Sequence, residues 1–390
     1  MRLIFKFGGS SLSSAEKIQM VASYIKEIKS RKDIELVVVV SAMGKTTNKL
    51  IKFANILSQN PYSYAYSSLI SIGENISASA LTLALEEQNV PAIYMNCKDI
   101  KIHAKGKATD AIITSIDTHK IEHHLSCDKV VVVTGFQGVN NQEQILTLGR
   151  GGSDTTATAL GAVLNAKVKI FTDVDGFYSC DPNVYKNAIK INNINISSAL
   201  NLCSFGTKVL SSRSVEVSNK YKVDVSICQS LTNKDSKILY TNLENYHIDG
   251  ITNKTNLSYV KYTYKNTDFL QHIKENNNFK IYHISQNKQN KSTITEFLSD
   301  ISLQELNSLI AKKTNSIICN SCDCVLIAGS GLSFYPDLIK KVQKIIKINH
   351  INYYFINLTP TTLKICVKKN QGKKVTDILI NEFNLCYKEN

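Results

Sequence analysis

Residues 149–182 read GRGGSDTTATALGAVLNAKVKIFTDVDGFYSCDP, and this stretch decides the fold. A glycine-rich turn with Arg150 and Asp154 leads into a helix, the helix leads into an apolar strand, and the strand ends on Thr172 and Asp173. Glycines let backbone N–H groups approach an anion, and a helix N-terminus adds the positive end of its dipole. An arginine can hold a carboxylate through two parallel hydrogen bonds. The stretch therefore predicts phosphate and carboxylate chemistry, which needs a partner loop.

Strands alternate with helices through the rest of the first 245 residues. We expect apolar strands at residues 3–7, 36–40, 90–95 and 129–134, and helices at 14–30, 74–88 and 118–126. Residues 97–115 are less regular, and a long surface excursion is expected there. This alternation predicts an α/β fold, with a mostly parallel sheet sandwiched by helices and ligands at the carboxyl ends of the strands.

Ligand-type residues fall at those strand ends. Lys6 stands with the pair Gly8 and Gly9 after the first strand, and residues 41–47 follow the second. Gly135 follows a later strand, before the opening stretch begins. Residues 44–46 read Gly-Lys-Thr, but a P-loop is excluded because its first glycine would fall inside the second strand. One cleft built from several loops is therefore expected.

The sequence changes character near residue 245, with fewer glycine turns and more Asn and Lys. Residues 1–245 are expected to form the catalytic domain and residues 246–390 a paired regulatory and dimerisation region. Within that region the patterns predict two ferredoxin-like α+β modules of the order βαββα, one of them partial, with a helix near 267–276 in the first. The first covers about 248–310 and is shortened, and the second covers about 318–385.

Composition gives expectations about the partners and the cellular compartment of the protein. The formal net charge of +14 suggests nucleic acid as a partner, but the lysines lie in Asn- and Ile-rich runs over the whole chain, so no nucleic acid is expected. Ten cysteines without a secretory segment indicate a reduced, cytoplasmic setting. We expect no membrane association and no apolar run as long as a membrane span.

Seven ordered motifs carry a family resemblance. They read KFGGSS, SAMGKTTN, GENISASAL, TGFQG, GRGGSDTTATAL, TDVDGFYSCDP and FGTKVLSSRSVE. Over residues 2–240 they resemble the aspartate kinases of the amino acid kinase family, and residues 246–390 resemble the paired ACT domains of that family. The resemblance implies transfer of phosphate from ATP to the side-chain carboxylate of L-aspartate, giving 4-phospho-L-aspartate. This is the first step towards lysine, threonine, methionine and diaminopimelate.

The resemblance also implies roles for individual residues. The catalytic residues would be Lys6, Asp154 and Lys208. The nucleotide would be bound by Lys6, Gly8, Gly9, Ser10, Thr172, Asp173, Tyr178, Asp181 and Lys208. The amino acid would be bound by Ser41, Thr47, Glu74, Arg150, Gly151, Ser153 and Asp154. Arg150 would hold the α-carboxylate, Glu74 the α-ammonium group, and Asp154 would orient Lys6. No protein ligand set for a metal is evident, and Mg²⁺ would arrive with ATP.

Several alternatives stay open at this point. Asn183 stands where the family usually has an arginine, and SSRSVE replaces a His-Pro turn. A kinase for glutamate, N-acetylglutamate or UMP, or a catalytically silent ACT sensor of amino acids, would also fit. Tyr178 could be ordinary packing, Lys208 a surface lysine, and Glu74 with Arg150 a structural ion pair. A homodimer formed through the ACT region is expected, with weak or absent feedback inhibition.

Two short motifs resemble metal sites. His119, Glu122 and His123 have the spacing H-x-x-E-H, and residues 319–324 read C-x-x-C-x-C. Neither has the further ligands that a zinc site needs, so we expect a surface helix in the first case and buried strand cysteines in the second.

Overall fold

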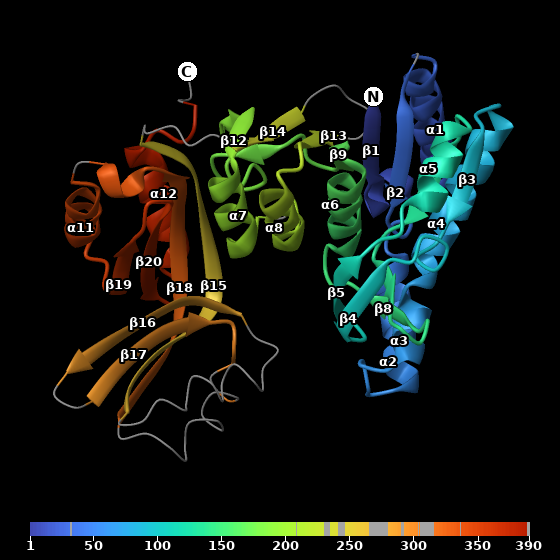
Figure 1. The fold of residues 1–390 in the computed structure, drawn as a ribbon. Coiled ribbons are helices and arrows are strands. Elements are labelled where there is room, and N and C mark those ends of the chain that lie inside the picture. Colours follow the sequence, from blue (N-terminus) through green and yellow to red (C-terminus); the bar gives the residue numbers. More distant parts are fainter. Residues whose placement is uncertain are drawn as a thin grey trace. The chain divides into compact units, whose positions relative to one another are not determined.

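The computed structural model describes the chain as two compact units (Figure 1). Unit 1 contains Met1–Phe177, Lys190–Cys203 and Lys208–Asn242, and unit 2 contains Tyr178–Ile189, Ser204–Thr207 and Leu243–Asn390. The described residues are 1–31, 33–207, 209–229, 235–240, 246–264, 280–289, 292–302, 304, 316–335 and 337–387. The predicted fold class is confirmed, with a largely parallel α/β unit followed by antiparallel α+β structure.

Unit 1 is built on an eight-stranded sheet with the order β12-β14-β13-β9-β1-β2-β6-β3. Its strands are β1 (Arg2–Phe7), β2 (Glu35–Val40), β3 (Ala92–Met95), β6 (Val130–Thr134), β9 (Lys167–Thr172), β12 (Asn193–Asn195), β13 (Val225–Gln229) and β14 (Asp235–Leu239). β1 pairs in parallel with both β2 and β9, while β13 and β14 are antiparallel. Every residue of β6 is buried, as expected for a parallel strand covered on both faces.

Unit 1 also contains helices, some of which pack on the faces of this sheet. They are η1 (Gly9–Leu12), α1 (Ala15–Lys29), α2 (Thr46–Leu57), α3 (Tyr64–Ile70), α4 (Ile72–Glu87), α5 (His119–Ser126), α6 (Gly152–Leu164), α7 (Ile196–Phe205) and α8 (Ser212–Tyr221). α1 and α4 share a hydrophobic cluster with Phe5 and Phe7 of β1. Because side chains alternate along a strand, Lys6 points to the opposite face, where α6 contacts β1 and α8 packs on α6 (Figure 1).

The expectation of an irregular excursion at residues 97–115 is wrong. The segment contains a hairpin of β4 (His103–Lys107) and β5 (Asp110–Ser115), which joins β7 (Gln137–Val139) and β8 (Ile145–Thr147) in a four-stranded sheet with the order β5-β4-β7-β8. The small side chains of Ala104 and Ala111 pack against Leu146 and Leu148. Alanines and polar residues give no clear strand pattern, so the sequence hid this hairpin.

The expectation about apolar length is also wrong. α3 and α4 together form one apolar helical stretch, Tyr64–Glu87, whose 24 residues are long and apolar enough to cross a membrane by length and composition alone. Half of its most apolar window is buried inside the structure, and α4 packs on β3 and β6. This is the behaviour of a core helix in a globular domain.

Unit 2 contains a six-stranded antiparallel sheet with the order β16-β17-β15-β18-β20-β19. Its elements are β15 (His247–Tyr264), β16 (Ile281–Gln289), β17 (Ser292–Ser299), β18 (Ser316–Ser330), η2 (Leu332–Phe334), α11 (Leu338–Ile348), β19 (Tyr353–Leu358), β20 (Thr362–Lys368) and α12 (Gly372–Glu382). β18, α11, β19, β20 and α12 form the βαββα order expected of the second module. The helix expected near 267–276 lies outside the described residues. Two short strands, β10 (Phe177–Tyr178) and β11 (Lys190–Ile191), pair in a separate two-stranded sheet.

The two long strands of unit 2 each run through both modules. Residues 258–264 of β15 pair with β17, whereas residues 247–254 pair with the second half of β18. That half of β18 also pairs with β20, which makes the four-stranded order β15-β18-β20-β19. In the same way, β18 supplies the strand next to β15 in the order β16-β17-β15-β18. Each module therefore completes the sheet of the other.

Candidate active site

The candidate site begins where β1, β2 and β9 end side by side. Phe7, the last residue of β1, is in register with Val40 of β2 and with Phe171 of β9. Backbone hydrogen bonds continue the sheet one residue beyond these strand ends. The N–H of Gly8 donates to the carbonyl of Phe171 at 3.1 Å, and the N–H of Ser41 donates to the carbonyl of Phe7 at 3.1 Å. The parallel sheet thus brings three of the predicted loops together.

Gly9 lets the first loop touch the second. The N–H of Gly44 donates to the carbonyl of Gly9 at 2.9 Å. A Cβ atom on Gly9 would lie only 2.6 Å from the carbonyl oxygen of Ala42, which is closer than real Cβ contacts. Gly44 itself has φ +51, a left-handed conformation that favours glycine. The two turns are therefore held as one unit by backbone contact.

Lys6 and Asp154 form the charged centre of the site. The Nζ atom of Lys6 lies 2.7 Å from Oδ1 of Asp154, and the two side chains are only 10% and 13% exposed. Lys6 comes from the end of β1, and Asp154 from the first turn of α6, whose N-terminus carries partial positive charge. Burial of both partners means that removing one would leave an uncompensated charge. The pairing agrees with the expected orienting role of Asp154, which stays a prediction.

Glu74 lies in the first turn of α4 and is 3% exposed. Its Oε1 atom accepts a hydrogen bond from the N–H of Ala42 at 3.1 Å, and its Oε2 atom is buried without a hydrogen-bond partner among the described residues. Burial raises the pKa of Glu74 to about 7, and the Ala42 hydrogen bond and the charge of Lys6 oppose that rise. A buried carboxylate with an unpaired oxygen suits a cationic ligand, because the ligand would replace the interactions with water that were lost on burial.

Close packing brings Glu74 to this position. A Cβ atom on the preceding Gly73 would lie 2.6 Å from Cβ of Ala42. The glycine therefore allows the start of α4 to rest directly on the turn after β2. Sequence reasoning assigned Glu74 to the site but gave no sign that the backbone of Ala42 would hold it.

Arg150 is placed before α6 by two glycines in the left-handed conformation, Gly149 with φ +72 and Gly151 with φ +73. Its side chain is exposed and makes no ion pair with any residue that the structure describes. The structural ion pair between Glu74 and Arg150 is therefore not formed. Ser153 is buried and packs tightly against Gly135. A Cβ atom added to Gly135 would lie 2.6 Å from the Cβ atom of Ser153.

Ser211 and Arg213 belong to the site region, although they were not among the predicted site residues. The N–H of Ser211 donates to Oδ2 of Asp154 at 3.4 Å, and its hydroxyl caps α8 by accepting from the N–H of Ser214. The sequence SSRSVE thus forms a regular helix start in place of the His-Pro turn. Arg213 ties α8 to the hairpin through an ion pair with Asp110 at 2.8 Å.

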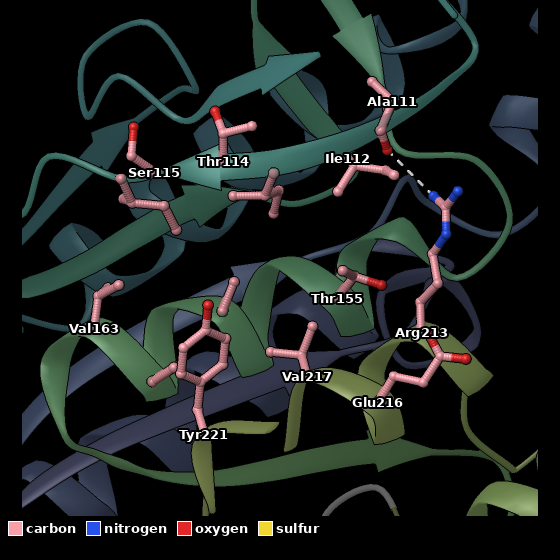
Figure 2. A pocket seen from close by; sticks show the side chains of 14 residues that line it. Ala111, Ile112, Thr114, Ser115, Thr155, Val163, Arg213, Glu216, Val217 and Tyr221 are labelled. Carbon is pink, nitrogen blue, oxygen red and sulfur yellow. Dashed lines mark hydrogen bonds between the residues drawn. The ribbon is translucent and has the colours of Figure 1, made fainter. Parts of the chain in front are cut away.

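A groove beside this region is shown in Figure 2. It lies between β5, α6 and α8, encloses about 280 Å³, and is lined mainly by aliphatic side chains such as Ile112, Val163 and Val217 (Figure 2). Arg213 crosses one end and donates to the carbonyl of Ala111 at 3.2 Å (Figure 2). None of the predicted site residues lines this groove. Its apolar walls do not suit a nucleotide or an acidic amino acid, so we place the candidate site at the strand ends.

Two further predicted residues lie at the edges of the site. Ser10 is exposed at the start of η1, and its carbonyl accepts from Nζ of Lys17 at 2.9 Å. Thr47 is half-buried in the first turn of α2, directly after the turn that contacts Gly9. Both positions are open to a ligand, and their roles stay predictions.

The predicted nucleotide residues are divided between the two units. Thr172 and Asp173 lie at the end of β9 in unit 1, where the Thr172 hydroxyl donates to the Asp173 carboxylate at 2.9 Å. Tyr178 and Asp181 belong to unit 2, and Tyr178 packs against its hydrophobic cluster. The packing alternative for Tyr178 is therefore realised, which does not remove the prediction that it also binds nucleotide. Lys208 lies outside the described residues.

Asn183 has a clear local role. Its backbone N–H and its side-chain amide both donate to Oδ1 of Asp181, at 2.9 Å and 3.1 Å. Asn183 thus closes the turn after Asp181. The sequence departure noted above is accommodated by a hydrogen-bonded turn.

The structure describes parts of the two metal-like motifs. His119 is 92% exposed on α5, and among the described residues no group of three His, Cys, Asp or Glu side chains is placed to hold an ion. Cys322 and Cys324 are fully buried in β18, as the interpretation of strand cysteines predicts. The side chain of Cys319 lies outside the described residues.

Comparison with known proteins identifies the family. The sequence profile of the Amino acid kinase family matches residues 1–229. The chain belongs to this family. Among amino acid kinase relatives, an aspartokinase of Rickettsia felis is 31% identical over 98% of this chain and 99% of its own length. The resemblance stated from the sequence is thereby confirmed.

Other relatives match a little over half of the chain. An aspartate kinase of Stutzerimonas stutzeri is 40% identical over 58% of this chain, and the chain spans 55% of its length in that match. Among solved structures, E. coli aspartokinase III in complex with aspartate and ADP has a TM-score of 0.81. It is 20% identical, with 98% of this chain and 100% of the other covered, and so shows the shared fold.

Proposed function

We propose that the protein is an ATP-dependent aspartate kinase. An oxygen of the aspartate side-chain carboxylate attacks the γ-phosphorus of ATP, the bond from that phosphorus to the bridging oxygen breaks, and 4-phospho-L-aspartate and ADP leave. The single observation that carries this proposal is the buried Lys6–Asp154 pair, 2.7 Å apart, at the junction of β1 and α6. The relatives named aspartokinase over their full length support it.

Lys6 is proposed to hold the transferred phosphoryl group. Phosphoryl transfer requires little covalent chemistry from the protein, so positioning and charge stabilisation dominate. The Cα of Gly8 lies close to Lys6, because a Cβ atom there would be 3.7 Å from Nζ. The absence of that Cβ leaves room beside the ammonium group for a phosphate. Asp154, 2.7 Å from Nζ, would keep the ammonium group directed at this space.

The acceptor is proposed to be a free amino acid. Glu74 offers a buried carboxylate oxygen without a partner among the described residues, which is suited to an α-ammonium group. The exposed guanidinium of Arg150 is suited to an α-carboxylate. An acceptor whose amine is acetylated, such as N-acetylglutamate, would leave Glu74 unpaired, so the site favours aspartate or glutamate over it.

Mg²⁺ is proposed to come with ATP. The described residues offer no protein-only cluster that could hold an ion, and Mg²⁺ commonly binds through substrate phosphates, water and one or two carboxylates. The ion would neutralise charge on the phosphates. This agrees with a site whose own groups act on the amino acid and on the transferred group.

The proposal is tested by measuring ADP release with a panel of acceptors under identical conditions. Aspartate, glutamate, N-acetylglutamate and UMP are each supplied with ATP and Mg²⁺. We expect turnover with aspartate to exceed that with each of the others. Turnover with glutamate but not with aspartate would assign another kinase of the family, and binding of amino acids without any ADP release would assign a silent ACT sensor.

The biological setting is proposed from the same chemistry. The product would feed the synthesis of lysine, threonine, methionine and diaminopimelate in the cytoplasm. We propose a homodimer formed through residues 246–390, as the ACT-like sheet of unit 2 suggests. Sedimentation of the full-length chain at several concentrations measures this directly.

A further inference from the structure

Two cysteine thiols meet where the C-terminal residues contact the segment Tyr178–Ile189. The Sγ atoms of Cys180 and Cys386 lie 3.5 Å apart, although the residues are 206 positions apart in the chain. Both belong to unit 2. Such a pair needs only a short approach of the two sulfur atoms to form a covalent bond.

The backbone around the two thiols is already held together. Ala188 forms a β-bridge with Cys386, and the N–H of Tyr387 donates to the carbonyl of Asn187 at 2.8 Å. The hydroxyl of Ser179 donates to the carbonyl of Leu385. The residues next to each cysteine therefore hold the two segments together, so that the sulfur atoms can form a bond without a large movement of the backbone.

The two thiols differ in access to solvent. Cys180 is 4% exposed, whereas Cys386 is partly exposed. Burial raises the pKa of Cys180 to about 12, with the contact to Cys386 adding to the rise, so Cys180 is a poor first nucleophile. This division gives one accessible thiol that reacts first and one enclosed thiol that completes the bond.

We propose that Cys180 and Cys386 form a reversible disulfide when the protein meets an oxidised low-molecular-weight disulfide such as glutathione disulfide. The thiolate of Cys386 attacks one glutathione sulfur, and one glutathione thiol leaves. The thiolate of Cys180 then attacks Sγ of Cys386, and the second glutathione leaves. Two electrons pass to glutathione disulfide, and the two thiol protons end on the two glutathiones released.

The bond would fix the predicted nucleotide segment to the C-terminal residues. Tyr178 and Asp181 lie in that segment, so this consequence rests on the proposed function. A segment that must adjust to its ligand binds less tightly when its accessible conformations are restricted. We expect the KM for ATP to rise by about threefold or more after oxidation and to return after reduction.

Peptide mapping under non-reducing conditions tests the bond itself. Trypsin releases residues 170–186 with Cys180 and residues 375–388 with Cys386, and each peptide contains a single cysteine. We expect these two peptides to be linked after treatment with glutathione disulfide and to separate after dithiothreitol. The exposed Cys127 provides a matched control, since Cys127→Ser should leave the link intact while Cys386→Ser removes it.

Two outcomes would overturn the inference. Glutathione retained on Cys386 with Cys180 still free would exclude the disulfide, and a complete disulfide without any change in the KM for ATP would exclude the effect on the nucleotide segment. The peptide map needs no turnover. A protein that links the two peptides but phosphorylates no aspartate would therefore contradict the proposed function and leave the disulfide supported.

Discussion

Lys6 and Asp154 form a nearly buried ion pair, with Nζ 2.7 Å from Oδ1, that joins the end of a central strand to the start of a helix. The pair lies on the face of the sheet opposite the aromatic cluster of Phe5, Phe7 and Phe171. Strand alternation thus places Phe5 and Phe7 of β1 on one face of the sheet and Lys6 on the other. The same six-residue strand serves the core with one face and the site with the other.

Lys6→Ala should lower turnover by about a hundredfold or more, the effect of losing one preorganised charge-stabilising group. Measured kcat with saturating ATP and aspartate checks this. Lys49→Ala on the exposed face of α2 is the matched lysine control and should leave kcat unchanged. Unchanged activity in Lys6→Ala would contradict the phosphoryl-holding role.

Asp154→Asn should lower kcat through Lys6. In a double-mutant cycle with Lys6→Ala, the second substitution should cost much less than it does alone, with a coupling of about 1–3 kcal/mol in the activation free energy. Strictly additive effects would show that Asp154 acts on the substrate independently of Lys6.

Glu74 should give aspartate binding a pH dependence. Its pKa of about 7 in the free protein means that ionisation, and with it the attraction for an ammonium group, increases as the pH rises through 7. The KM for aspartate should fall over this range. Glu74→Gln should raise that KM at pH 8 by about tenfold to a hundredfold, the effect of losing a hydrogen bond to a charged group, and should abolish the pH dependence. Glu86→Gln on the same helix is the control.

Glu74 should also make the free protein less stable at high pH. A carboxyl group whose pKa is raised on folding binds more protons in the folded state between its unfolded value, near 4.5, and about 7. Stability from this group is therefore present below pH 4.5 and is lost as the pH rises through 7. At pH 8, Glu74→Gln should be more stable than the unsubstituted protein by about 3 kcal/mol, and the difference should vanish below about pH 4.5. Chemical denaturation at the two pH values checks this.

Substitutions of Gly8 and Gly9 should affect catalysis and stability separately. Gly9→Ala places Cβ against the Ala42 carbonyl at 2.6 Å, so it should destabilise the fold by about 1–3 kcal/mol. Gly8 has φ −72 and ψ 165, which alanine adopts, so Gly8→Ala should leave the Tm unchanged. Its Cβ would occupy the space beside Lys6, and kcat/KM for ATP should fall by about tenfold. Equal losses of Tm in both variants would contradict this division.

Feedback inhibition should be weak. The first module is expected to be shortened, its sequence is rich in Asn and Lys, and no effector-binding motif is visible in that sequence. Millimolar lysine or threonine should change activity by less than about fivefold, the lower end of typical allosteric coupling. Strong inhibition by either amino acid would contradict this expectation.

Much of unit 1 could be predicted because its strands are uniformly apolar and end in glycine or small-residue turns. The same logic predicted that Lys6 and the glycine-rich turn with Asp154 belong to one cleft, and the family resemblance added Glu74. It could not find the hydrogen bonds from the N–H groups of Ala42 and Ser211, since backbone donors leave no trace in residue type. The β4–β5 hairpin was missed for a related reason, because alanine carries little strand preference and its burial depends on distant residues.

The shared strands β15 and β18 have a consequence for how unit 2 can be taken apart. Since each strand lies in both four-stranded sheets, a cut that isolates one module removes a strand from the other. The two modules therefore do not fold independently, and neither should be stable as an isolated fragment. Thermal unfolding of this region should be a single cooperative transition. A destabilising substitution in one module should therefore lower the stability of the other.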